Sequence, residues 1–278
     1  LFQMVILQVE GKSTLPVLRQ QAAEKKNLES YSAVCRHLYE EDENSELLLL
    51  YADSIRLQGI QTKSLDCFIE YYSWKSAACF LNGDFTNGYA LKRKAIALAE
   101  KFNKTNYIAD CAGDIGYYFN VDARYDSARH YLKRGMEVSE HQPSLSRWYR
   151  TMLTNYASSY IFEGKTDSAL IFTLQAEKRS VADKDTALLI ENLNQLGTLY
   201  RRKKMQEECI ASFEKALHLC EVQENYQTTA FIYCNIATAY SDWNRLEDAL
   251  PFSRKAVEYA KLQGGKQMMA LCQLNLGA

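Results

Sequence analysis

The sequence has 278 residues, of which 47% are hydrophobic, and its 33 basic residues nearly balance its 34 acidic residues. Only 12 glycines and 3 prolines interrupt the chain, a low content of helix breakers that favours an all-helical protein. Because proteins that grip nucleic-acid phosphates carry a basic excess, the balanced charge argues against a direct nucleic-acid contact.

The amino-terminal part is predicted to be helical but irregular. Residues 1–7 are apolar, yet too short to span a bilayer, and no other segment approaches a membrane span. Three helices are predicted at 15–26, 30–40 and 45–57. We interpret residues 1–65 as a degenerate helical cap, because the terminal units of repeat proteins are commonly atypical.

From residue 66 onward, a small residue returns every 40 or 41 residues. We call these residues the markers: Ser76, Gly116, Ala157, Gly197, Ala237 and Gly277. After each of the first five markers, an aromatic residue or cysteine stands three positions later and small residues stand 12 and 19 positions later. A fixed period in this range indicates a solenoid of stacked units. Residues 66–278 are therefore predicted to hold five repeats and the start of a sixth.

Each repeat is predicted to be a helical hairpin. Most of the short segments between its two helices hold residues suited to turns, as at 82–84, 163–165 and 243–245. The marker and the small residue 12 positions later predict a close crossing of small against small side chains. Pro251 is expected in the first turn of a second helix, where its missing N–H costs little.

The pattern resembles the tetratricopeptide repeat. Residues 196–200 carry its Leu-Gly-x-x-Tyr motif, 209–217 carry its second-helix half with Cys209 in place of alanine, and 233–256 give another good copy. The resemblance covers about 66–278 and implies a right-handed α-solenoid of antiparallel helix pairs. The period departs from the usual length of roughly 34 residues, and the closing proline is absent. Long repeats of this kind are similar to those of kinesin light chains and of the sensing regions of bacterial regulators.

In that family, the first helices of the repeats line a concave groove. Two positions before the markers stand mostly amides or acids, namely Trp74, Asp114, Asn155, Gln195, Asn235 and Asn275. Amides both donate and accept, so this row is suited to an extended peptide backbone. The alternative is that the amides only bridge neighbouring helices or face water. The residues predicted for the groove are Asp114, Tyr117, Asn155, Phe162, Glu191, Asn194, Gln195, Arg201, Arg202, Asn235 and Asp242.

Two features narrow the expected ligand. No lysine stands three positions before a marker, so the carboxylate-gripping version of the family's groove is not expected. The basic run at 201–204 ends a first helix, where cations complement the helix dipole. The alternative is that these basic residues contact an acidic ligand.

Motifs for chemistry do not emerge from the sequence. The 4 histidines form no metal-binding pair, and no nucleophile elbow or phosphate loop is present, so we expect no enzyme activity, no metal and no cofactor. None of the 8 cysteines forms a C-x-x-C pair, and we interpret them as small core residues. Unpaired cysteines favour the cytoplasm, whereas a periplasmic location requires that a signal peptide was removed.

These observations favour a binding scaffold that holds a peptide or protein segment in the groove. The alternative is the ligand-sensing region of a larger bacterial signalling or transcription-regulatory protein whose output domain is absent from this chain. A third hypothesis is that the chain is an accessory domain of an enzyme. Self-association through the ends of the repeat array is a further possibility that the sequence allows. Residues 274–278 look like the opening of a sixth repeat, so we expect the natural protein to continue.

Overall fold

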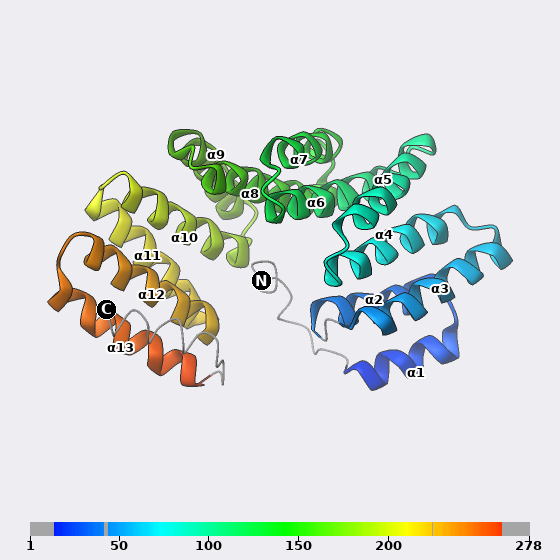
Figure 1. The fold of residues 1–278 in the computed structure, drawn as a ribbon, viewed down its shortest axis with the longest axis horizontal. Coiled ribbons are helices and arrows are strands. Elements are labelled where there is room, and N and C mark those ends of the chain that lie inside the picture. Colours follow the sequence, from blue (N-terminus) through cyan, green and yellow to red (C-terminus); the bar gives the residue numbers. More distant parts are fainter. Residues whose placement is uncertain (1–13, 42–43, 224, 263–278) are drawn as a thin grey trace. The chain divides into compact units, whose positions relative to one another are not determined.

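The computed structural model describes residues 14–41, 44–223 and 225–262. The described residues form 13 α-helices, one short 3-10 helix and no strand, which confirms the predicted all-α solenoid class (Figure 1). The helices are α1 (Leu15–Lys25), α2 (Leu28–Glu40), α3 (Ser45–Thr62), α4 (Leu65–Leu81), α5 (Phe85–Lys101), α6 (Thr105–Val121), α7 (Tyr125–Ser139), α8 (Ser146–Glu163), α9 (Thr166–Ala182), α10 (Thr186–Arg202), α11 (Gln206–Val222), α12 (Tyr226–Asp242) and α13 (Leu246–Leu262), with the 3-10 helix at Pro143–Leu145.

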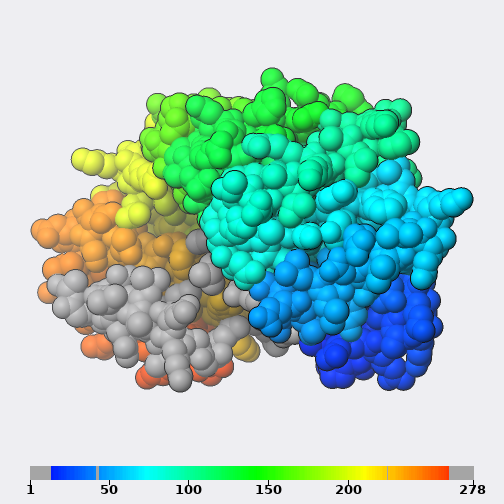
Figure 2. All heavy atoms as spheres, turned by 45° about the vertical axis from the view of Figure 1, so that its right-hand side comes forward, coloured from blue at the N-terminus to red at the C-terminus, as the bar shows by residue number. Residues whose placement is uncertain are grey.

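The chain divides into two compact units, residues 1–155 and 156–278, and the division falls within α8. In the first unit, α3 packs on α4, α4 on α5 and α6 on α7. The side chains of α3 to α5, drawn from blue to cyan in Figure 2, form one continuous surface. In the second unit, α10 packs on α11 and α12 on α13. The three helices predicted at the amino terminus are confirmed, with the third extended to Thr62. The division into a cap at 1–65 and repeats at 66–278 stays a prediction.

The turn inside each hairpin has one backbone signature. The residue seven positions after the marker has a positive φ in all five repeats, at Gly83, Ala123, Gly164, Lys204 and Asn244. Glycine reaches this left-handed region without strain, and asparagine tolerates it better than most residues. The turns predicted at 82–84, 163–165 and 243–245 are therefore confirmed. The turn falls at the same position of each repeat because the chain must reverse its direction at the same point each time.

The glycine markers pack against large side chains. A Cβ atom added to Gly116 would lie 2.5 Å from Leu132 Cγ, and one added to Gly197 would lie 2.5 Å from Phe213 Cε1. At Gly116 the predicted small residue Ala128 also lies close, with its carbonyl oxygen 3.3 Å from the added Cβ atom, whereas the three atoms nearest to the one added at Gly197 all belong to Phe213. The bare glycine backbone leaves the space that a large side chain of the second helix fills.

The position 16 residues after the marker is buried in every repeat, and the sequence analysis missed it. The residue there is large where the marker is glycine and small where the marker is alanine. The pairs are Gly116 with Leu132, Gly197 with Phe213, Ala157 with Thr173 and Ala237 with Ser253. The remaining pair is Ser76 with Lys92, a fully buried lysine. Compensating volumes of this kind keep the packing density of a core constant.

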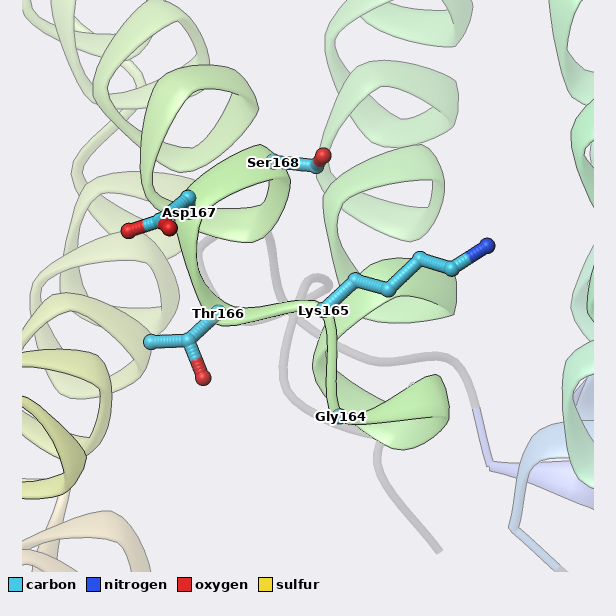
Figure 3. A pocket seen from close by; sticks show the side chains of 5 residues that line it. All are labelled: Gly164, Lys165, Thr166, Asp167 and Ser168. Carbon is cyan, nitrogen blue, oxygen red and sulfur yellow. The ribbon is translucent and has the colours of Figure 1, made fainter.

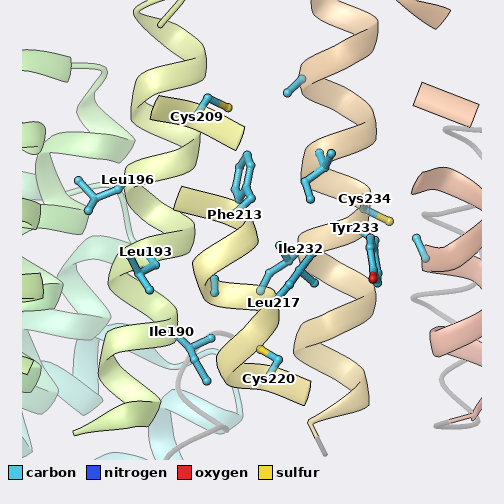
Figure 4. Close-up of a cluster of buried hydrophobic side chains, with 14 residues drawn as sticks. Ile190, Leu193, Leu196, Cys209, Phe213, Leu217, Cys220, Ile232, Tyr233 and Cys234 are labelled. Carbon is cyan, nitrogen blue, oxygen red and sulfur yellow. The ribbon is translucent and has the colours of Figure 1, made fainter. Parts of the chain in front are cut away.

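The core of the second unit is continuous across three helices. Figure 4 shows Leu196 of α10, Phe213 of α11 and Ile232 of α12 among the buried side chains of this cluster. Six of the cysteines that the structure describes are buried, which fits their interpretation as core residues: Cys35, Cys67, Cys111, Cys209, Cys220 and Cys234. Cys272 lies outside the described residues.

Pro251 corrects one expectation. Helix α13 begins at Leu246, so Pro251 lies inside the helix and not in its first turn. A proline there cannot donate a hydrogen bond to the carbonyl of Glu247.

Candidate functional site

Hydrogen-bonded polar residues gather on the first helices of the repeats in the second unit. We call the following group the amide cluster: Ser158 on α8, Glu191, Asn194 and Gln195 on α10, and Asn235 on α12. Asn235 Nδ2 donates to Asn194 Oδ1 over 2.8 Å. Gln195 Nε2 lies 3.1 Å from Ser158 Oγ and 3.2 Å from Glu191 Oε1. The cluster thus brings together four of the predicted groove residues and adds Ser158, which the sequence analysis did not single out.

The amide cluster contains two groups that are poorly satisfied. Burial raises the pKa of the Glu191 carboxyl to about 7, and the hydrogen bond from Gln195 opposes this shift only in part. Gln195 Oε1 is a buried acceptor with no hydrogen-bond partner among the described residues. A buried acceptor of this kind has lost its water without gaining a donor.

In the first unit, the corresponding helices carry acids. We call Glu70, Asp110 and Asp114 the carboxylate cluster. Glu70 accepts from Trp74 Nε1 over 2.7 Å, and Asp110 accepts from Trp148 Nε1 over 3.1 Å. Burial raises the pKa of both Glu70 and Asp110, and the Asp114 carboxylate raises that of Asp110 further.

Sequence reasoning named Glu191 for the groove but missed that a carboxylate recurs at its position. Glu70, Asp110 and Glu191 each stand six positions before a marker. The spacing was visible in the sequence, but the burial that perturbs these acids was not. A shared register position places each of them on the same face of its own first helix.

Asn155 and Tyr117 are placed in the first unit. Asn155 is only 7% exposed, its carbonyl accepts from Asn120 Nδ2 over 2.9 Å, and its Nδ2 has no partner among the described residues. The Tyr117 ring lies edge-on to that of Tyr118, with the centroids 5.3 Å apart. Asn155 therefore helps to join α6 to α8.

The basic run at the end of α10 is already engaged by its own unit. Arg201 Nη1 lies 2.5 Å from Asp242 Oδ2, and Arg202 Nη1 donates to the Ile161 carbonyl over 2.8 Å. These contacts join the ends of successive first helices. Phe162, beside Ile161, is 57% exposed at the end of α8.

A shallow hollow lies at the start of α9 (Figure 3). It is lined by Gly164, Lys165, Thr166, Asp167 and Ser168. Its charged side chains already have partners, since Lys165 pairs with Glu163 and Asp167 with Lys203. The hollow therefore offers a ligand no isolated charge.

Over the residues that the structure describes, no group of histidine, cysteine or acidic side chains is arranged to hold a metal ion. No described helix has the length and apolarity needed to cross a membrane.

Comparisons with known proteins bear on the fold. Residues 185–261 match the family model for the tetratricopeptide repeat. A search of curated proteins gave no match. The resemblance to tetratricopeptide repeats expected from the sequence is confirmed by this match and by the solved structures that follow.

Three solved structures illustrate the structural likeness. Aspartyl phosphate phosphatase F from Bacillus subtilis aligns with a TM-score of 0.71 and 13% identity, over 94% of this chain and 74% of that chain. The apo quorum sensor NprR from B. thuringiensis aligns with a TM-score of 0.67 and 18% identity, over 94% and 74%. NprR in complex with its cognate peptide NprX aligns with a TM-score of 0.60 and 17% identity, over 94% and 76%. At such identities, the likeness shows the fold of tetratricopeptide-like repeats.

Proposed function

We propose that this chain binds an extended peptide or protein segment along the face of α8, α10 and α12 that carries the amide cluster. The observation that carries the proposal is the bonded pair of part-exposed amides, Asn194 and Asn235. The N–H and carbonyl groups that this bond leaves over match the carbonyl and N–H groups of an extended backbone.

The bridging role of these amides is compatible with a ligand role. The bond between Asn235 and Asn194 uses one N–H and one carbonyl oxygen, and each amide side chain has further donor or acceptor capacity. The bond also fixes the orientation of both side chains before a ligand arrives. Preorganised groups bind better because less conformational entropy is lost on association.

The fold of NprR supports the proposal, because that protein is solved in complex with its cognate peptide. The present chain shares this fold. We propose that it binds its ligand through the side chains of its own amide cluster. Binding, and not catalysis, is the role that these residues suit.

The experiment uses the full chain and pools of random heptapeptides that are acetylated and amidated to remove terminal charge. Peptides retained by the protein are measured by affinity selection and mass spectrometry. Asn194→Ala combined with Asn235→Ala is expected to reduce retention, because both side-chain amides are lost. Asn106→Ala, which removes an exposed amide of α6, is the matched control and is expected to change nothing. Equal retention by the double variant and the control would show that the amides are not involved.

A second candidate is a ligand-sensing region, which the structural likeness to the quorum sensor NprR favours. A sensor requires that the ligand bind two conformations with unequal affinity. Hydrogen exchange distinguishes the two functions. A peptide that protects only α8, α10 and α12 supports a scaffold, whereas changes that extend to α4 and α6 support a sensor.

A further inference from the structure

Glu191 has no counter-charge, unlike several other acids of the second unit. Asp167, Asp183, Asp242 and Asp248 each lie beside a lysine or arginine. Within the described part of this unit, no ion pair includes Glu191, and the side chain that hydrogen-bonds to its carboxylate is the neutral Gln195. The structure thus contains a partly buried carboxylate that lacks a counter-charge.

The neighbouring helices do not supply this missing charge. On α10 itself, Arg201 pairs with Asp242. On α9, Arg179 pairs with Asp183. The pKa of Glu191 is set by burial and by Gln195, with no contribution from a charged group of α8, α9, α11 or α12 among the described residues. A desolvated carboxylate without a cation is costly, and a bound cation would remove that cost.

The side chains around Glu191 favour a ligand that donates hydrogen bonds. Gln195 Nε2 already bonds Glu191 Oε1 and Ser158 Oγ, and Gln195 Oε1 stays without a donor. The side chain of Glu191 is only partly buried, so a ligand can reach it. A part-exposed carboxylate without a cation matches a group with N–H donors and a positive charge.

We propose that Glu191 binds a cationic nitrogen group of the ligand, which makes the chain selective for basic peptides. The proposal rests on the peptide-binding function above and names the chemistry of its ligand. Gln195 orients the carboxylate through its Nε2, while Asn194 and Asn235 hold the peptide backbone.

The test compares four pools of heptapeptides with otherwise random sequence. Three pools are acetylated and amidated, with arginine, lysine or norleucine at the central position. The fourth has norleucine at the centre and a free amino terminus. The full chain, Glu191→Gln and the control Glu214→Gln are each titrated with fluorescent versions of the pools. Glu214 is an exposed acid of α11.

The wild-type chain and Glu214→Gln are expected to bind at least one cationic pool about tenfold more tightly than the acetylated norleucine pool, as charge-assisted hydrogen bonds allow. Glu191→Gln is expected to lose that preference. The arginine, lysine and free-terminus pools identify which cationic group is preferred. For wild type, binding of the arginine or lysine pool should strengthen from about pH 5.5 to about pH 8, because these side chains stay charged while the Glu191 carboxyl ionises.

Equal binding of all four pools, or a preference that survives in Glu191→Gln, would overturn the inference and leave the proposed function standing. The absence of binding by every pool would overturn both. The pH series on the wild-type chain gives the same decision if Glu191→Gln does not fold, since a pH-independent preference for cations would exclude Glu191.

Discussion

Lys92 Nζ on α5 lies 2.8 Å from Asp114 Oδ2 on α6, and the lysine side chain is almost completely buried. The same Nζ donates to Ser73 Oγ on α4 over 2.8 Å, so one lysine joins three successive helices. Burial lowers the pKa of Lys92, but Asp114 and neighbouring acids raise it above the ordinary value, and the lysine stays charged. The predicted groove residue Asp114 is thus held in place by a group from a second helix.

Removing this lysine is expected to weaken the first unit. Lys92→Ala should lower the free energy of unfolding by about 2–4 kcal/mol, because it leaves a cavity and orphans Ser73. Lys92→Met should cost less, since its side chain fills most of the space. Urea denaturation followed by circular dichroism measures both. Lys94→Ala, which removes an exposed lysine of the same helix, is the control and should change the free energy by less than about 0.5 kcal/mol. Equal effects of the two alanine variants would contradict a structural role for Lys92.

The glycine markers give a second prediction. Gly197→Ala places a Cβ atom 2.5 Å from Phe213 Cε1, and we expect a net loss of about 1–2 kcal/mol after the gain in helix propensity. Adding Phe213→Leu should recover part of this loss. Gly113→Ala is the matched control, because its Cβ atom would meet Met152 Cγ at 3.4 Å and should be tolerated. Thermal melts of the four proteins test this, and an unchanged melting temperature for Gly197→Ala would refute the tight contact.

The buried carboxylate predicts a pH dependence of stability. The pKa of Glu191 is raised from 4.5 to about 7 in the folded chain, so the folded state binds the proton more tightly than the unfolded state. Its contribution to stability is therefore present at low pH and is lost as the pH rises from about 4.5 to about 7. Glu191→Gln should be more stable than wild type at about pH 8, by on the order of 1–3 kcal/mol, and nearly equal to it at about pH 4.

Denaturation midpoints at the two pH values measure this difference. Glu214→Gln, the exposed control, should track the wild-type chain at both. If Glu191→Gln and wild type differ by the same amount at both values, Glu191 is not buried in the way described.

Asn120 gives a further prediction in the first unit. Its Nδ2 donates to the Asn155 carbonyl over 2.9 Å, and its Oδ1 is buried without a partner among the described residues. Asn120→Ala should cost about 1 kcal/mol, as the loss of a neutral hydrogen bond does. Asn120→Asp should cost more at neutral pH, because a carboxylate would then face a carbonyl oxygen.

Protonation of that aspartate restores a donor, so the Asn120→Asp variant should regain stability as the pH falls. Chemical denaturation between about pH 4 and about pH 8 would test this, since buried carboxyls titrate within that range. Equal stability of the alanine and aspartate variants at all pH values would count against the contact.

Much of the fold could be predicted because its signals are local and repeated. Gly83, Gly164 and Asn244 mark turns in the sequence and have positive φ in the structure. The markers predicted the tight crossings, yet Gly197 meets Phe213 and not a small residue. That partner stands 16 positions away on another helix, and only a packed structure shows which side chain enters the space.

The candidate site was less predictable. Asn194, Gln195 and Asn235 were expected on one face. Asn235 bonds Asn194 and Gln195 bonds Ser158, which agrees with the alternative that the amides bridge neighbouring helices. Ser158 and Lys92 were missed, because a serine or a lysine on an amphipathic helix ordinarily faces water.

The sequence by itself determined that this protein repeats a helical hairpin about every 40 residues, since periodic small residues and turn residues act within one unit. Only the tertiary structure decided which buried polar groups have a hydrogen-bond partner. The partners of Asn235, Gln195 and Arg202 stand 41, 37 and 41 residues away, one repeat distant, where no local pattern reaches. Whether a carboxylate such as Glu191 is desolvated without a cation depends on every helix packed around it, which is a property of the assembled core.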